Sequence, residues 1–154
     1  MSNIGIKGFV RIQLKDSNGN ILSDTGFKQN QITNASLAAI SGLVGNTGSQ
    51  TAFTYLALGT SNTATSASHT TLQAEITDSG LARHAATVTR STTTQTNDTL
   101  QLDYTWTASG TKTVEEIGIF NASSGGVMFG RKLTTSLPVT SGINVVATYK
   151  VIFS

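Results

Sequence analysis

Apolar and polar side chains alternate in the first part of the chain. Between Ile4 and Leu14, apolar residues or glycine occupy every second position, and Lys, Arg and Gln occupy most positions between them. Successive strand side chains point to opposite faces, so this pattern predicts a half-buried strand. Asn18-Gly19 follows between two apolar stretches and indicates a β-hairpin, since both residues tolerate positive φ.

The C-terminal half shows the same alternation. Residues 100–106, 114–120 and 127–133 are predicted strands, separated by turn clusters of Gly, Ser and Asn. The last segment, 143–153, is apolar on one parity, while Val146 and Ile152 make its other face partly apolar. We expect this strand to be covered on both sides, by a second sheet or by a neighbouring subunit.

One segment has a helical period instead. Leu37, Ile40 and Val44 are spaced i, i+3 and i+7; Asn34 can cap the start, and Gly45 suits the position after the end. A helix of about ten residues is marginal alone in water, so it must pack on a sheet.

The middle of the chain is less regular. Residues 53–58 form a short, nearly continuous apolar run typical of a central strand, whereas residues 59–70 have no periodicity. Thr70 and Gln73 predict a capped helical turn that runs to Ile76.

Seven or eight strands with one short helix predict an all-β fold. The expected architecture is an antiparallel β-sandwich or barrel, of jelly-roll or tulip type, in a single domain covering residues 1–154. A chain of this length buries roughly 68–70% of its unfolded surface, enough for a core without disulfides, and it has no cysteine. No apolar run approaches the ~18–20 residues that span a bilayer, so we expect neither a membrane partner nor a secretion signal.

The number and spacing of the charged residues bear on whether the chain binds nucleic acid. Charged residues make up 12% of the chain, against roughly 25% in typical domains, and Ser and Thr provide much of the polar surface. Ten Lys and Arg against eight Asp and Glu give a formal charge of only +2, despite a pI near 9.1. The cations form no basic stripe along the sequence, so we expect no nucleic acid partner.

The side chains that carry chemistry form no recognised motif. His69 and His84 are fifteen residues apart, which matches no zinc signature, and there is no G-x-S-x-G or phosphate-binding loop. Glu115 and Glu116 are adjacent and would point to opposite faces of a strand, where one of them suits a structural hydrogen bond or ion pair at the sheet rim. We therefore predict no enzyme activity, no cofactor, and no catalytic or metal-binding residues.

Aromatic residues do not indicate a sugar-binding platform. Tyr55, Tyr104, Trp106 and Tyr149 each share parity with apolar neighbours, which favours core or interface packing over a solvent-facing stacking surface.

Several segments resemble structural proteins of tailed bacteriophages. Phe27 to Gly45 (FKQNQITNASLAAISGLVG) is similar to the N-L-I-T-D-A-G-L-x-x-I-A block of these proteins, with Asn34-Ala35-Ser36 in place of Asp-Ala-Gly. YLALGT, TTLQAEI…LAR, EEIGIFNASSGGVMFGRKL and VVATYKVIF continue the pattern in the same order. The resemblance implies an all-β virion subunit that often works as a trimer and has no catalytic residues.

The favoured function is therefore that of a capsid decoration, or cement, protein. It would lie on the capsid surface of the virion, bind the major capsid protein and copies of itself as a homotrimer, and bridge capsid subunits. The last strand would help form the trimer core, and the arm 2–7 and loop 59–70 would contact the capsid. The candidate interface residues are Ile4, Ile6, Thr60, Ser61, Asn62, Tyr149, Val151 and Phe153.

Two alternatives remain open. The chain could be a tail, baseplate or fibre component that contacts other tail proteins or host glycans, although it lacks the repetitive shaft of a complete fibre. It could also be a small carbohydrate-active enzyme or sugar-binding module.

Overall fold

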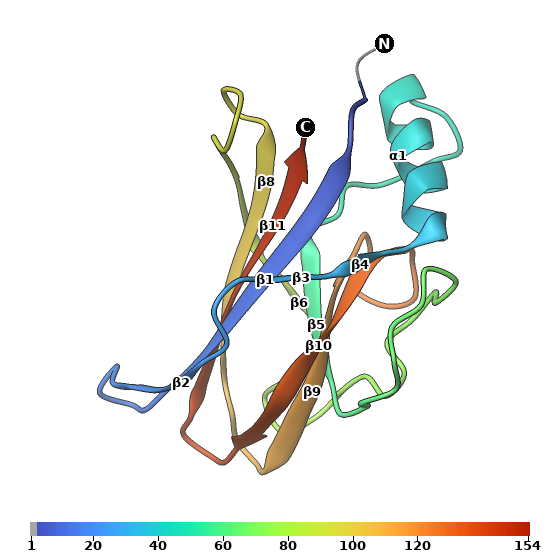
Figure 1. Cartoon of the computed structure of the whole chain (residues 1–154). Helices are drawn as coiled ribbons and strands as arrows, with labels where there is room; N and C mark the ends of the chain where they lie inside the picture. Colours follow the sequence, from blue (N-terminus) through green and yellow to red (C-terminus); the bar gives the residue numbers. More distant parts are fainter. Residues whose placement is uncertain (1–2) are drawn as a thin grey trace.

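The computed structural model describes residues 3–154, which form two antiparallel sheets and one helix (Figure 1). Ser2, part of the expected arm 2–7, lies outside the described residues. The elements in chain order are β1 (Ile6–Lys15), β2 (Ile21–Asp24), β3 (Lys28–Gln29), β4 (Gln31–Ile32), α1 (Asn34–Gly45), β5 (Tyr55–Gly59), β6 (His84–Ala85), β7 (Thr87–Ser91), β8 (Thr99–Thr107), β9 (Lys112–Phe120), β10 (Met128–Val139) and β11 (Asn144–Phe153).

The two sheets face each other and do not close into a barrel. The first has the strand order β2-β1-β11-β8-β7, with β3 also paired to β1; the second has the order β4-β10-β9-β5-β6. This confirms the all-β prediction and selects the sandwich over the barrel. β5 is paired on both sides, by β9 and β6, as expected for a short apolar strand inside a sheet.

The core lies between the two sheets and follows the predicted parity. In β1, the side chains of Val10, Ile12 and Leu14 are buried, and Val145 and Ala147 of β11 are fully buried opposite the second sheet. Each fully buried side chain of this size contributes about 1.5–3 kcal/mol through loss of water contact. The second sheet therefore covers the inner face of the last strand, as expected, whereas Val146 and Ile152 on its outer face stay half-buried.

The helix forms where it was predicted, with caps shifted by one residue. Thr33, not Asn34, is the N-cap: its hydroxyl accepts a hydrogen bond from the Ser36 N–H at 3.2 Å and donates one to the Met128 carbonyl at 2.5 Å. The C-cap is Asn46, in the left-handed conformation at φ 51°. Because Thr33 bonds both to the helix and to β10, it ties the start of α1 to the second sheet. Among residues 3–154, the structure contains no helix with the length and apolarity needed to cross a membrane.

The predicted helical turn at 70–76 is wrong. This segment is irregular and contains one isolated bridge, between Gly59 and Glu75. The N–H groups of Gln73 and Ala74, which a helix start would have left to a local cap, instead donate to the Glu116 carboxylate of β9. A long-range partner therefore replaces the local one.

Candidate interaction surfaces

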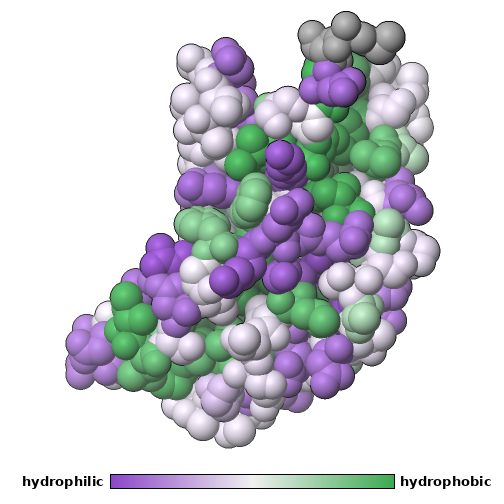
Figure 2. Space-filling view, viewed as in Figure 1, coloured by the Kyte–Doolittle hydropathy of each residue, from purple (hydrophilic) through white to green (hydrophobic). Residues whose placement is uncertain are grey.

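One end of the sandwich carries an apolar cavity of about 300 Å³, here called the apical hollow. It opens between the C-terminal half of α1 and the β7–β8 hairpin. Figure 2 shows a notch between two projections at this end, with hydrophobic surface at its base and along one side. Thr54 is the only lining residue that is not apolar. The lining residues are Ile40, Leu43, Val44, Ala52, Phe53, Thr54, Val88, Leu100, Phe129 and Phe153.

The hollow has a fixed floor and exposed walls. Phe53 and Phe129 pack edge to face at its base, with ring centroids 5.0 Å apart. At the walls, Val44 is 85% exposed, Val88 41% and Phe153 38%. Contiguous apolar surface of this kind marks interaction sites in soluble proteins. The apical hollow is therefore a candidate contact surface for another protein.

A second exposed apolar group lies at the opposite end of β1. Ile21 and Leu22, here called the hairpin tip, are each 57% exposed in the β1–β2 hairpin. Ile21 pairs with Lys15 at the end of β1, whereas Ile6 at its start pairs with Phe153 of the apical hollow. Figure 1 shows this hairpin projecting away from the sheets. The two apolar groups thus lie at opposite ends of the molecule.

Asp24 holds the base of the hairpin. Its carboxylate accepts from the Arg11 guanidinium through two nitrogens and from the Gln13 amide, and it also accepts the Gly26 N–H. These bonds, the one from Arg11 first, hold the pKa of Asp24 well below its usual range.

Asp16 performs the same role in the turn. Its carboxylate accepts the N–H groups of Asn18 and Asn20 and the Asn20 side-chain amide, each at 2.9 Å. The Asn20 amide is the largest of the contacts that lower the pKa of Asp16. The turn predicted at Asn18-Gly19 is present, with Gly19 at φ 84°, so the exposed tip stands on a rigid polar base.

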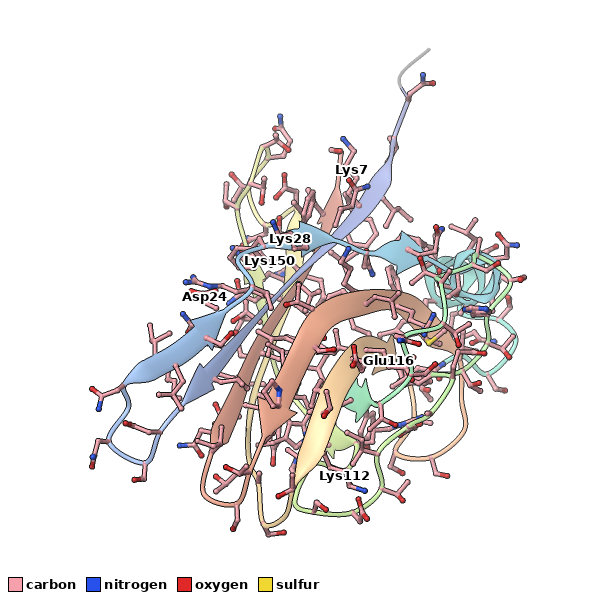
Figure 3. All side chains as sticks on the ribbon, turned by 60° about the horizontal axis from the view of Figure 1, so that its bottom comes forward. Lys7, Asp24, Lys28, Lys112, Glu116 and Lys150 are labelled. Atoms are coloured by element: carbon pink, nitrogen blue, oxygen red, sulfur yellow. The ribbon has the colours of Figure 1, made fainter. Side chains whose placement is uncertain are left out.

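A buried ion pair fixes the long loop 60–83 onto the second sheet. Glu116 of β9, labelled in Figure 3, and Arg131 of β10 are both fully buried, with the Arg131 Nε 2.5 Å from the carboxylate. The Glu116 carboxylate also accepts the N–H groups of Gln73 and Ala74, and Arg131 donates to the Thr63 carbonyl. The predicted ion pair of Glu115 or Glu116 exists, but inside the protein and not at the sheet rim.

Arg83 closes the same loop further along. It donates to both carboxylate oxygens of Glu75 and to the carbonyls of Ala122 and Gly125, and its guanidinium lies 3.6 Å from the Phe120 ring centroid. Together the two arginines hold both halves of loop 60–83.

A smaller cavity of about 200 Å³ opens at the side of the sandwich between β1 and β10. Its floor includes the buried Val10 and Ile12, and Lys28 and Lys132 line it. Neither lysine takes part in an ion pair among the described residues. Two cations over an apolar floor suit a small anion with an apolar body.

The two histidines are not brought into a common site. His69 lies with its Nδ1 3.4 Å from Arg131, whereas His84 stacks on Tyr104 with ring centroids 4.2 Å apart. Residues 3–154 contain no cluster of three or more side chains suited to hold a metal ion.

A family model described as "Podophage GP4 fiber I protein gp80" matches residues 19–150, which is 132 of the 154 residues. The chain belongs to this family. It is therefore a bacteriophage virion structural protein, as the resemblance of its sequence to tailed-phage proteins implied. Neither the search of curated proteins nor that of solved structures gives a match.

Three of the interface residues predicted from the sequence lie at one end of the sandwich. Phe153 lines the apical hollow, Ile6 pairs with it across the strands, and Ile4 is 81% exposed close by. Thr60 and Asn62 are exposed in the loop that follows β5. Thr60, where that loop begins, is seven residues after Phe53 of the hollow, which is roughly 20 Å along an extended strand. The loop and the hollow are therefore separate surfaces.

Tyr149 and Val151 need correction as interface residues. Both are 0% exposed and lie between the two sheets, so they are not available to a partner. The Tyr149 hydroxyl accepts a hydrogen bond from the Asn30 side chain, and burial raises its pKa well above the ordinary tyrosine range. These side chains belong to the core of the single chain.

Sequence reasoning missed most of the exposed apolar residues. The helical spacing predicts that Leu37 and Val44 pack on the sheet, but they are 53% and 85% exposed, and Ser36 and Ala39 are the buried residues of α1. The Asn18-Gly19 signal predicts a hairpin whose second strand starts at Ile21 and Leu22, without indicating that both side chains are exposed. The sequence did contain a signal for this exposure: adjacent strand residues point to opposite faces, so two apolar residues beside a tight turn cannot both face the core.

Proposed function

We propose that this chain is a structural component of the phage fibre or tail apparatus. The observation that carries the proposal is the match of residues 19–150 to a family named for a fibre protein. The matched range starts in the β1–β2 turn and ends in β11, so it includes most of the sandwich. The similarity therefore concerns the fold itself and not a short appended segment.

The proposed mode of action is binding without a catalytic step or a cofactor. The partners would be other virion proteins, including further copies of this chain, and not nucleic acid or membrane. Support comes from how the charges are used: the Glu116 carboxylate is saturated by Arg131 and two backbone N–H groups, and Asp16 and Asp24 hold a hairpin. The apical hollow and the hairpin tip remain as exposed apolar surfaces for a partner.

Capsid decoration is the second candidate. What favours it is that residues 3–154 form a compact sandwich and contain no extended, repetitive shaft. In this role the chain would bind the outside of the assembled head and stabilise that state by mass action.

Location and copy number on the virion distinguish the two candidates. An antibody against the purified chain, coupled to gold, is applied to intact virions and viewed by electron microscopy, and the copy number is measured by quantitative mass spectrometry. A fibre or tail component gives gold at the tail end and a copy number far below that of the major capsid protein. Gold spread over the head, with a copy number approaching that of the capsid protein, contradicts the fibre proposal and supports decoration.

A further inference from the structure

We propose that copies of this chain associate head to tail, with the hairpin tip of one copy inserted into the apical hollow of the next. The proposal does not depend on where the chain lies in the virion, because the purified protein tests it. It uses the two exposed apolar groups at opposite ends of the molecule, namely the tip residues Ile21 and Leu22 and the hollow beside Phe153.

The hollow has the size and chemistry for this occupant. Its lining is apolar apart from Thr54, and its volume is about 300 Å³. A cavity of roughly 150 Å³ lined by Leu, Ile and Phe holds one benzene molecule, so the hollow has room for two branched aliphatic side chains. A charged or strongly polar occupant would lose its water without gaining a partner there.

The hairpin tip has the matching chemistry. No residue from Ser17 to Leu22 carries a charge, so the tip can enter an apolar site without the desolvation of an ion. The nearest carboxylate, that of Asp16, already accepts three hydrogen bonds from its own turn. The tip is thus an uncharged projection with two exposed aliphatic side chains.

The hairpin is also held ready for binding. A two-stranded ribbon that projects from a sheet is marginally stable on its own, but here Asp24 bonds to Arg11 and Gln13 at its base. A tip fixed in one conformation loses less conformational freedom when it binds.

The proposed contact joins two different surfaces, the hairpin tip of one copy and the apical hollow of the next. β1 separates the tip from the hollow by ten residues, or about 30 Å at ~3.3 Å per residue, so a chain cannot fill its own hollow. An interface between two different surfaces closes into a ring when the rotation permits and otherwise grows into a filament. A ring of three would be the homotrimer expected from the sequence, and a filament would repeat every ~30 Å or somewhat more.

The first test uses two variants that each remove one surface. Ile21→Ser/Leu22→Ser removes the tip and Val44→Asp places a charge at the hollow; all three side chains are exposed, so we expect the fold to survive, as checked by circular dichroism. Leu37→Ser is the matched control, because Leu37 is 53% exposed on α1 but does not line the hollow. Molar mass is measured by light scattering across a range of concentrations.

The wild type and the control should form oligomers, whereas each surface variant alone should associate at least tenfold more weakly. An equal mixture of the two variants should form a dimer and nothing larger, since the mixture retains one intact tip and one intact hollow. A wild type that stays monomeric at about 1 mM, where only contacts with a Kd weaker than roughly 1 mM escape detection, overturns the proposal. So does a mixture that stays monomeric while the wild type associates.

A second test, by disulfide cross-linking, detects the contact directly and does not rely on a variant that weakens association. The chain has no cysteine, so Leu22→Cys/Val44→Cys introduces the only two thiols. They cannot bridge within one chain, because a disulfide needs Cα atoms within about 7 Å. Oxidation should give a ladder or ring of linked copies, while each single-cysteine variant stays mainly unlinked. Efficient dimers of Leu22→Cys alone would mean that tip meets tip, which contradicts the proposal.

Discussion

Arg131→Met should strongly destabilise the protein, because it removes one half of a fully buried ion pair. The Glu116 carboxylate would stay at 0% exposure with only the N–H groups of Gln73 and Ala74 as partners. Breaking a buried pair in this way costs about 3–5 kcal/mol. For a chain of this size, each kcal/mol lowers Tm by roughly 2–4 °C, so the expected loss is about 6–20 °C.

Guanidinium unfolding measures this loss directly. Trp106 is the only tryptophan and is 2% exposed in β8, so its fluorescence reports on the opening of the core. The matched control is the pair Lys112 and Asp78, whose side chains are 29% and 63% exposed. Lys112→Met should change the free energy of unfolding by little more than the error of the measurement, since exposed pairs contribute little.

A double variant separates the two roles of the pair. Glu116→Leu/Arg131→Met removes both buried charges and should recover much of the lost stability, because an apolar pair of similar volume is often as stable as a buried ion pair. It cannot restore the bonds to Gln73, Ala74 and Thr63, so loop 60–83 should be cut faster by protease than in the wild type. A loss below about 1 kcal/mol for Arg131→Met would refute the reasoning, and so would a loop equally resistant in the double variant.

Three further predictions follow from the caps and the charged contacts. Thr33→Ala should lower the free energy of unfolding by about 0.5–2 kcal/mol, measured in urea, because it removes the N-cap of α1. Arg83→Lys should cost about 1.5–3 kcal/mol by the same assay, since lysine cannot keep the two-nitrogen contact with Glu75. The lowered pKa of Asp24 means that its hold on the hairpin is complete above the ordinary carboxyl value near 3.9, weakens as pH falls below that value, and is fully lost only below the depressed pKa of the folded state. In an NMR titration carried down to about pH 1, signals of residues 16–26 should therefore change before those of the core, and Asp24→Asn should show the change already at neutral pH.

The sandwich could be predicted because the strand pattern is a local property of the sequence. The parity of residues 4–14 and 143–153 directly gave the buried faces of β1 and β11, since burial alternates with side-chain direction. The helix caps were missed by one residue for a related reason. Thr33 and Asn34 are both acceptable N-caps in sequence, and the bond from Thr33 to the Met128 carbonyl, 95 residues away, selects the first.

The structure of loop 60–83 could not be predicted because its partners come from distant strands. Nothing near Gln73 or Ala74 indicates that their N–H groups bond to a carboxylate more than forty residues away. The sequence does hold a partial signal: Glu115-Glu116 and Arg131-Lys132 each place two adjacent charges in a predicted strand, so one charge of each pair must face the apolar side. A charge on that side is nearly always paired when buried, so the two strands could have been matched to each other.

The low charge of the chain has a consequence for assembly. Four ion pairs occupy Arg11, Arg83, Lys112 and Arg131 within the subunit, and the formal net charge is +2. Copies therefore repel one another weakly, and little electrostatic work opposes contact between them. With so little charge to keep copies apart, the contact proposed above between the hairpin tip and the apical hollow would meet little electrostatic opposition. Two of these pairs, Arg11–Asp24 and Lys112–Asp78, lie partly in solvent, so it is the apolar character of the two ends that suits the subunit to uncharged contacts.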